Sequence, residues 1–153
     1  MKLADLIQQD RFPSSGQEAM FNILVTSSWL TSELTAAMAP FGVTPAQYNV
    51  LRILRGSHPE AMTCSHIGAR LLDRTPDVTR LLNRLERNDL IHRARAERDR
   101  RIVEVGITEK GLALLERMDD VVEGTVERLT RHLSPQEHEH LSDLLERLRT
   151  DQT

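Results

Sequence analysis

The sequence predicts a mainly α-helical fold with one small β-hairpin, and three observations lead to this prediction. Apolar residues recur at helical spacing through most of the 153-residue chain. Two short helical segments, 64–72 and 75–88, follow one another across a tight connection. Two strand-like runs, 90–95 and 102–107, then flank a turn that is rich in arginine. This order is typical of a winged helix-turn-helix, here with further helices on either side.

The first long helix is expected to carry apolar residues on two faces. One stripe at helical spacing runs from Met20 to Met38, and Phe21, Val25 and Trp29 form a second stripe with a spacing of four residues. A helix that is apolar on two faces is buried on both of them. In so small a protein, the second face indicates contact with a partner subunit.

Local signals place the two short helices that follow. The stretch TPAQ, residues 44–47, has the N-cap, proline and glutamine of a capping box, so a helix is expected to begin there. Thr63 is expected to cap the next helix, with Ile67, Leu71 and Leu72 facing inward. A capping box at 134–137 likewise predicts the last helix, after a long helix over about 108–132.

The helix predicted over residues 75–88 has one apolar face and one polar, basic face. The second helix of a helix-turn-helix enters the major groove of DNA, where the polar face would meet base edges. Arg80 and Arg84 lie one turn apart and can reach guanine edges or phosphates. Asn83 can pair with adenine, and Thr79 can donate to a phosphate or touch a thymine methyl group.

The middle of the chain is basic although the whole chain has a net charge of −3. This pattern predicts that only the middle faces a polyanion. On the hairpin, Arg100 or Arg101 is expected to enter the minor groove, where a narrow groove concentrates negative potential. DNA would repel Asp99, so this residue is expected to pair with a neighbouring arginine and stabilise the wing tip. The expected DNA-binding residues are Thr75, Thr79, Arg80, Asn83, Arg84, Arg98, Arg100 and Arg101.

A recognisable pattern covers VTRLLNRLERNDLIHR, residues 78–93, and RAERDRRIVEVGITEKG, residues 95–111. It contains Arg-Leu-Glu near the end of the polar-faced helix, Asp-Arg-Arg at the hairpin tip, and Ile-Thr-Glu-Lys-Gly after the hairpin. These features resemble the MarR (multiple antibiotic resistance regulator) family of winged-helix repressors. The order of elements matches the family from about residue 17 to residue 150.

Two positions depart from the family pattern. Relatives usually carry glycine after the recognition helix, whereas this chain has Asn88 and Asp89, two residue types that also tolerate a left-handed backbone. Asp77, near the start of the recognition helix, is expected either to cap that helix or to accept a hydrogen bond from a cytosine amino group.

The resemblance implies a homodimer in which residues 1–40 and 108–153 form the dimerisation region and residues 41–107 form the winged helix-turn-helix DNA-binding domain. It implies a ligand-responsive repressor of transcription that binds double-stranded DNA at a palindromic operator and is released by a small-molecule effector. The effector pocket would lie between the dimerisation helices and the winged domain. Its candidate lining residues are Trp29, Met38, Tyr48 and Arg52, each of which could equally be plain core or interface.

Other functional classes find little support in the sequence. Cys64 is either a redox sensor or, as lone cysteines more often are, a small buried residue. The histidines lack metal-ligand spacing, so neither a metal nor another cofactor is expected. We see no phosphate loop, nucleophile elbow or paired carboxylates, and therefore expect no enzyme. No apolar run is suited to a membrane, and the single cysteine fits a reducing cytoplasm.

One alternative from another class is a helical protein–protein adaptor. In that hypothesis the basic face would meet an acidic partner protein rather than DNA. Selective binding to a palindromic DNA sequence separates the two hypotheses, because an adaptor would have no preference among DNA sequences.

Overall fold

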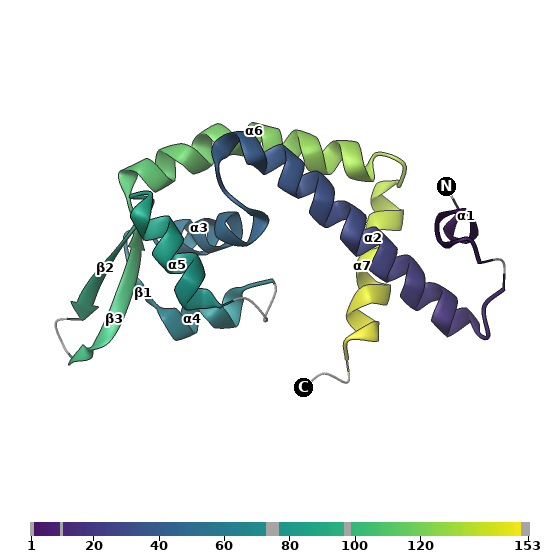
Figure 1. Ribbon diagram of the computed structural model, residues 1–153, viewed down its shortest axis with the longest axis horizontal. Coiled ribbons are helices and arrows are strands. Elements are labelled where there is room, and N and C mark those ends of the chain that lie inside the picture. The colour runs from purple at the N-terminus through teal and green to yellow at the C-terminus, as the bar shows by residue number, and fades with distance from the viewer. Residues whose placement is uncertain (1, 10, 73–76, 97–98, 151–153) are drawn as a thin grey trace.

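The computed structural model describes residues 2–9, 11–72, 77–96 and 99–150. It is mainly helical and contains one small sheet (Figure 1). This confirms the predicted fold class. In chain order the elements are α1 (Leu3–Ile7), α2 (Ser15–Met38), the 3-10 helix η1 (Ala39–Phe41), α3 (Pro45–Ser57), β1 (Met62–Thr63), α4 (Cys64–Arg70), α5 (Val78–Arg87), β2 (Ile91–Ala96), β3 (Asp99–Ile107), α6 (Glu109–Thr130) and α7 (Pro135–Leu148).

The sheet has three antiparallel strands in the order β1-β3-β2. The hairpin of β2 and β3 was expected from the sequence, whereas β1 was not. Strand β1 has only two residues, and it exists because Met62 and Thr63 pair with Val105 and Glu104 of β3. The pairing of β2 with β3 is irregular between Arg95 and Ala96, close to the tip of the hairpin.

The hydrophobic core lies mainly in the winged part of the molecule, which consists of α3, α4, α5 and the three-stranded sheet. Helix α3 packs against β3 and α6, α4 packs against β1 and β3, and α5 packs against β2, while the three helices also contact one another. Their inward side chains are removed from water almost completely, which is the dominant favourable term in folding. The largest fully buried side chains are Leu51, Leu54, Ile67, Leu82, Leu85, Leu115, Met118, Val50 and Val105.

The structure corrects one expectation about this core. Leu71 is buried as predicted, but Leu72 is 88% exposed. The reason is that α4 ends at Arg70 and the backbone becomes extended at Leu71, so helical spacing no longer applies one residue later.

Helix starts follow the predicted caps. The capping boxes at Thr44 and Ser134 are both complete, with the side chain and the backbone of each cap bonded to the residue three positions on. Asp77 caps α5, because its Oδ1 accepts from the backbone N–H of Arg80 at 3.1 Å. Of the two roles considered for Asp77, the structure therefore shows capping.

The turn after α5 uses the conformation that Asp89 was expected to tolerate. Asp89 has a φ of 58°, in the left-handed region. The chain then enters β2, and the hairpin returns to α6 beside the same turn. Thr108 caps α6 by accepting from the backbone N–H of Gly111 at 3.1 Å. A side chain at Gly111 would collide with the carbonyl oxygen of Leu90, so only glycine allows this close approach.

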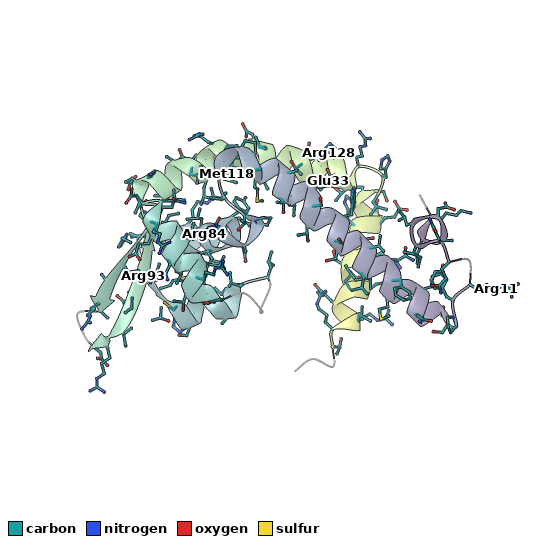
Figure 2. All side chains as sticks on the ribbon, viewed as in Figure 1. Arg11, Glu33, Arg84, Arg93, Met118 and Arg128 are labelled. Carbon is teal, nitrogen blue, oxygen red and sulfur yellow. The ribbon has the colours of Figure 1, made fainter. Side chains whose placement is uncertain are left out.

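The molecule has two ends, joined by α6 and α2. In Figure 1 the winged part lies under one end of α6, while α1, α7 and the N-terminal half of α2 lie at the other end. Helices α2 and α6 pack together along part of their length. An ion pair between Arg128 and Glu33, 2.8 Å apart, joins them, and Figure 2 labels both residues.

Candidate nucleic-acid interface

Helix α5 presents a polar face to solvent. Leu82 and Leu85 are completely buried beneath it, so the rotational orientation of the helix is fixed. The residues predicted to face DNA lie on the other side and are all exposed: Thr79, Arg80, Asn83 and Arg84. The structure therefore brings these four residues together on one accessible surface.

Arg93 of β2 also belongs to this surface, and sequence reasoning missed it. Its Nη2 donates to Oδ1 of Asn83 at 2.8 Å, and its Nε lies 3.6 Å from Oε2 of Glu86. The side chain is only 21% exposed. Arg84 on α5 and Arg93 on β2 are both labelled in Figure 2. Arg93 thus joins the base of the wing to the polar face of α5.

Asp99, expected to pair with the side chain of a neighbouring arginine, makes its short contact with the backbone of Arg101 instead. Oδ1 of Asp99 accepts from the backbone N–H of Arg101 at 2.9 Å and lies 3.9 Å from Nε of the same residue. The Arg101 side chain is 95% exposed and projects into solvent. The carboxylate therefore holds the backbone of the tip while leaving the guanidinium accessible.

Three predicted site residues cannot be placed in full. Thr75 and Arg98 lie outside the described residues. Arg100 is described only through its backbone, which belongs to β3.

Asp89, the acid in the turn after α5, has a compensating partner. Lys110 Nζ lies 3.8 Å from Oδ2 of Asp89 and donates to the carbonyl oxygen of Asn88 at 2.8 Å. The hydroxyl of Thr108 donates to the carbonyl oxygen of Asp89 at 2.7 Å. The Lys110 ammonium offsets the charge of Asp89, so this acid adds little net repulsion toward a polyanion.

The candidate effector residues lie in different settings. Met38 and Tyr48 are in the core, with 2% and 8% exposure. The guanidinium of Arg52 lies 5.9 Å from the centre of the Tyr48 ring. Trp29 is 46% exposed on α2.

An apolar groove of about 370 Å³ lies between α2 and the start of α3. Trp29, Met38, Tyr48 and Arg52 are not among its lining residues in the described chain. The groove is lined by Thr31, Leu34, Thr44, Pro45, Ala46, Asn49, Leu71 and Leu72.

A polar contact fixes the winged part to α6. Nη1 of Arg55 on α3 donates to both carboxylate oxygens of Asp119, at 3.1 and 2.9 Å. This hydrogen bonding raises the pKa of Arg55, and burial raises the pKa of the neighbouring Tyr48 hydroxyl. The guanidinium stays charged at all physiological pH values, so deprotonation of Arg55 does not break the link.

The fold and the surface together define a winged-helix protein with an exposed, partly basic recognition helix. The model of the MarR family matches residues 41–102. The regulator PecS from Dickeya dadantii is 31% identical over an alignment that covers 97% of this chain and 93% of PecS.

Solved structures of MarR proteins have a similar fold. A MarR transcription factor from Planctomyces limnophilus is 37% identical, with a TM-score of 0.70 over 89% of this chain and 98% of that one. A mutant of E. coli MarR in complex with operator DNA is 26% identical, with a TM-score of 0.75 over 82% and 89% of the two chains. The chain belongs to the MarR family.

Membership in this family makes the chain a DNA-binding transcriptional regulator rather than an enzyme. Across the described ranges, no helix is both long and apolar enough to cross a membrane. The same residues contain no group of three potential metal ligands.

Proposed function

We propose that the protein is a homodimeric, ligand-responsive repressor that binds a palindromic operator. The observation that carries the proposal is the exposed surface shared by α5 and the wing, where Thr79, Arg80, Asn83 and Arg84 lie beside the hairpin. In this proposal residues 41–107 bind DNA, and residues 1–40 and 108–153 form the dimer. Such a regulator would act in the cytoplasm, where its DNA is.

The dimer is supported by apolar side chains that one chain leaves uncovered. Helix α7, all of which is described, contributes no buried residue within a single chain. A groove of about 430 Å³ between α2 and α7 is almost entirely apolar. Exposed apolar patches of this kind mark interaction surfaces, and a second copy supplies a self-complementary face. The exposed large apolar residues of α2, α6 and α7 are Met20, Leu24, Trp29, Val121, Val126, Leu141, Leu144 and Leu148.

The DNA-binding mode follows from the shape of the surface. Helix α5 would lie in the major groove, where Arg80 and Arg84 reach guanine edges or phosphates. The wing would follow the backbone into the adjacent minor groove, where Arg101 projects freely from the tip. A two-fold dimer presents two such surfaces, so its operator would be a palindrome with half-sites one helical turn apart.

Repression and release follow from the same geometry. A dimer that occupies a promoter excludes the transcription machinery from it. Half-sites one turn apart tolerate little error in the spacing of the two recognition helices. The groove between α2 and α3 lies where the dimerisation helices meet the winged part, so an apolar effector bound there would change that spacing.

A gel-shift titration tests the proposal. Purified protein is titrated against the DNA upstream of its own gene, with scrambled DNA of equal length as competitor. We expect nanomolar binding, roughly a thousandfold or more tighter than to scrambled DNA. Equal, weak binding to both DNAs would contradict the proposal and favour the adaptor hypothesis, in which the basic face serves an acidic protein.

A further inference from the structure

Asn83 and Arg93 form the most specific polar contact on the DNA-facing surface. The guanidinium of Arg93 can only donate hydrogen bonds. The atom of Asn83 that lies 2.8 Å from Nη2 must therefore be the acceptor Oδ1. This chemical argument fixes the orientation of the amide, which the shape of the side chain alone would leave ambiguous.

The fixed orientation limits what Asn83 can offer to a base. The Oδ1 side of the amide is covered by a positive guanidinium, so Nδ2 with its two N–H donors is the free end. An asparagine that pairs with adenine needs both ends of the amide, one to accept from N6 and one to donate to N7. The contact with Arg93 occupies one of the two lone pairs of Oδ1 and places a positive charge beside it, which disfavours the approach of the amino donor of adenine.

We propose that Asn83 reads a hydrogen-bond acceptor, at guanine or thymine rather than adenine, and that Arg93 is the positioning residue that sets this preference. Guanine offers O6 and N7 and thymine offers O4, whereas adenine places an amino donor beside its N7. The inference rests on the proposed docking of α5 in the major groove and deepens it by naming the bases read at one position of each half-site.

Glu86 completes the arrangement. Its Oε2 lies 3.6 Å from Nε of Arg93, and it sits three residues after Asn83 on the same face of α5. The half-buried guanidinium thus bridges two residues of the recognition helix and offsets a carboxylate that would otherwise repel DNA phosphates. Because Arg93 is on β2, the base preference of Asn83 depends on the wing being correctly seated.

Selection of binding sites from a random DNA library tests the inference. Wild-type protein is expected to select guanine or thymine at a symmetric pair of positions. Arg93→Met retains the aliphatic stem but frees Oδ1, so the same positions should shift toward adenine by roughly tenfold while the others stay unchanged. Arg95→Met is the matched control, because it removes one arginine two residues further along the strand and should leave every base preference unchanged.

A second variant covers the case in which Arg93→Met folds poorly, which its melting temperature would reveal. Asn83→Asp keeps an acceptor for Arg93 but replaces the free donor with a carboxylate oxygen. We expect its selected sites to change at the same positions, to cytosine or adenine, whose amino groups donate.

The outcomes are distinguishable. An unchanged consensus in a folded Arg93→Met variant, or in Asn83→Asp, would overturn the role of this contact while leaving the DNA-binding function standing. Failure of the wild-type protein to select any consensus would overturn the proposed function itself.

Discussion

The two ends of the molecule differ in how much of their apolar surface a single chain buries. At the winged end, side chains such as Leu82 and Leu85 are fully buried, and the outward face of α5 is polar. At the other end, Leu24 and Leu148 are more than half exposed, although they lie on long, regular helices. The winged end thus buries its apolar surface within one chain, whereas the helical arms, which are α2, α7 and the C-terminal half of α6, leave apolar surface that the proposed second chain would cover.

This difference separates folding from function. The winged end needs no partner to place its recognition helix, because α5 packs on α3 and β2 within one chain, and the Arg55–Asp119 contact joins α3 to α6. In the proposed dimer, the arms would decide where the second recognition helix lies.

Removing a core side chain at the winged end should have the largest effect on the free energy of unfolding. Leu85→Ala is expected to lower the free energy of unfolding by about 2–5 kcal/mol, because the residue is fully buried and leaves a cavity. Urea denaturation monitored by circular dichroism measures the change. A loss below about 1 kcal/mol would contradict the packing described for α5.

A charge placed on the apolar surface of α7 should weaken the proposed dimer. Leu144 is 45% exposed in one chain, and a two-fold interface contains it twice. Leu144→Asp should therefore cost about 3 kcal/mol or more, which raises the dimer dissociation constant about a hundredfold. Analytical ultracentrifugation over a range of concentrations measures it. Leu72→Asp, an equally drastic change at an exposed residue of the winged part, should leave the oligomeric state unchanged, and a loss of dimer there would count against the assignment.

Loss of one arginine from α5 should weaken DNA binding. Arg84→Ala is expected to cost about 1–3 kcal/mol of operator affinity per half-site. Fluorescence anisotropy at fixed salt concentration measures this cost. Arg11→Ala removes the same charge at the opposite end of the molecule, where Figure 2 labels the residue. Equal losses in the two variants would mean that only overall charge matters.

At the wing tip, removal of a negative charge should weaken DNA binding rather than strengthen it. Asp99→Ala removes a negative charge, yet we expect DNA affinity to fall about two- to tenfold, because the Arg101 backbone N–H loses its acceptor. Asp99→Asn retains an oxygen acceptor at that position and should bind nearly as well as wild type. A gain in affinity for Asp99→Ala would show that Asp99 is merely tolerated.

The exposed ion pair between Glu33 of α2 and Arg128 of α6 should contribute least to the free energy of unfolding. Glu33→Gln removes the partner of Arg128 at a solvent-accessible site and is expected to change the free energy of unfolding by less than about 1 kcal/mol. Urea denaturation measures this too. A loss of several kcal/mol would mean that this pair, and not apolar burial, joins α2 to α6.

The sequence predicts those features of the molecule that rest on local signals. Capping boxes at Thr44 and Ser134 depend on residues three positions apart, and the alternation around Val105 depends on neighbouring residues. Such patterns are visible in one dimension, so the helix starts at Pro45, Cys64 and Pro135 and the hairpin were predicted correctly, whereas α5 begins at Val78 rather than at about residue 75.

Features that depend on distant partners were not predicted. Strand β1 exists only through pairing with a strand about forty residues later. Arg93 was one of many arginines in a basic segment, and nothing local marks it as the partner of Asn83. Helix α4 ends before Leu72, whose backbone N–H donates to Oδ1 of Asn49 on α3 at 3.1 Å. In each case the decisive contact crosses between elements that only the fold brings together.

The most direct test of the account is the dependence of binding on half-site spacing. Once the operator is known, five base pairs are inserted between its half-sites, which rotates one half-site by about half a helical turn. The account predicts that two chains bind the native operator and that the insertion lowers affinity by about a hundredfold or more, because the dimer holds its recognition helices at a fixed separation. Undiminished affinity for the longer operator would contradict it, since the two recognition helices would then bind DNA independently.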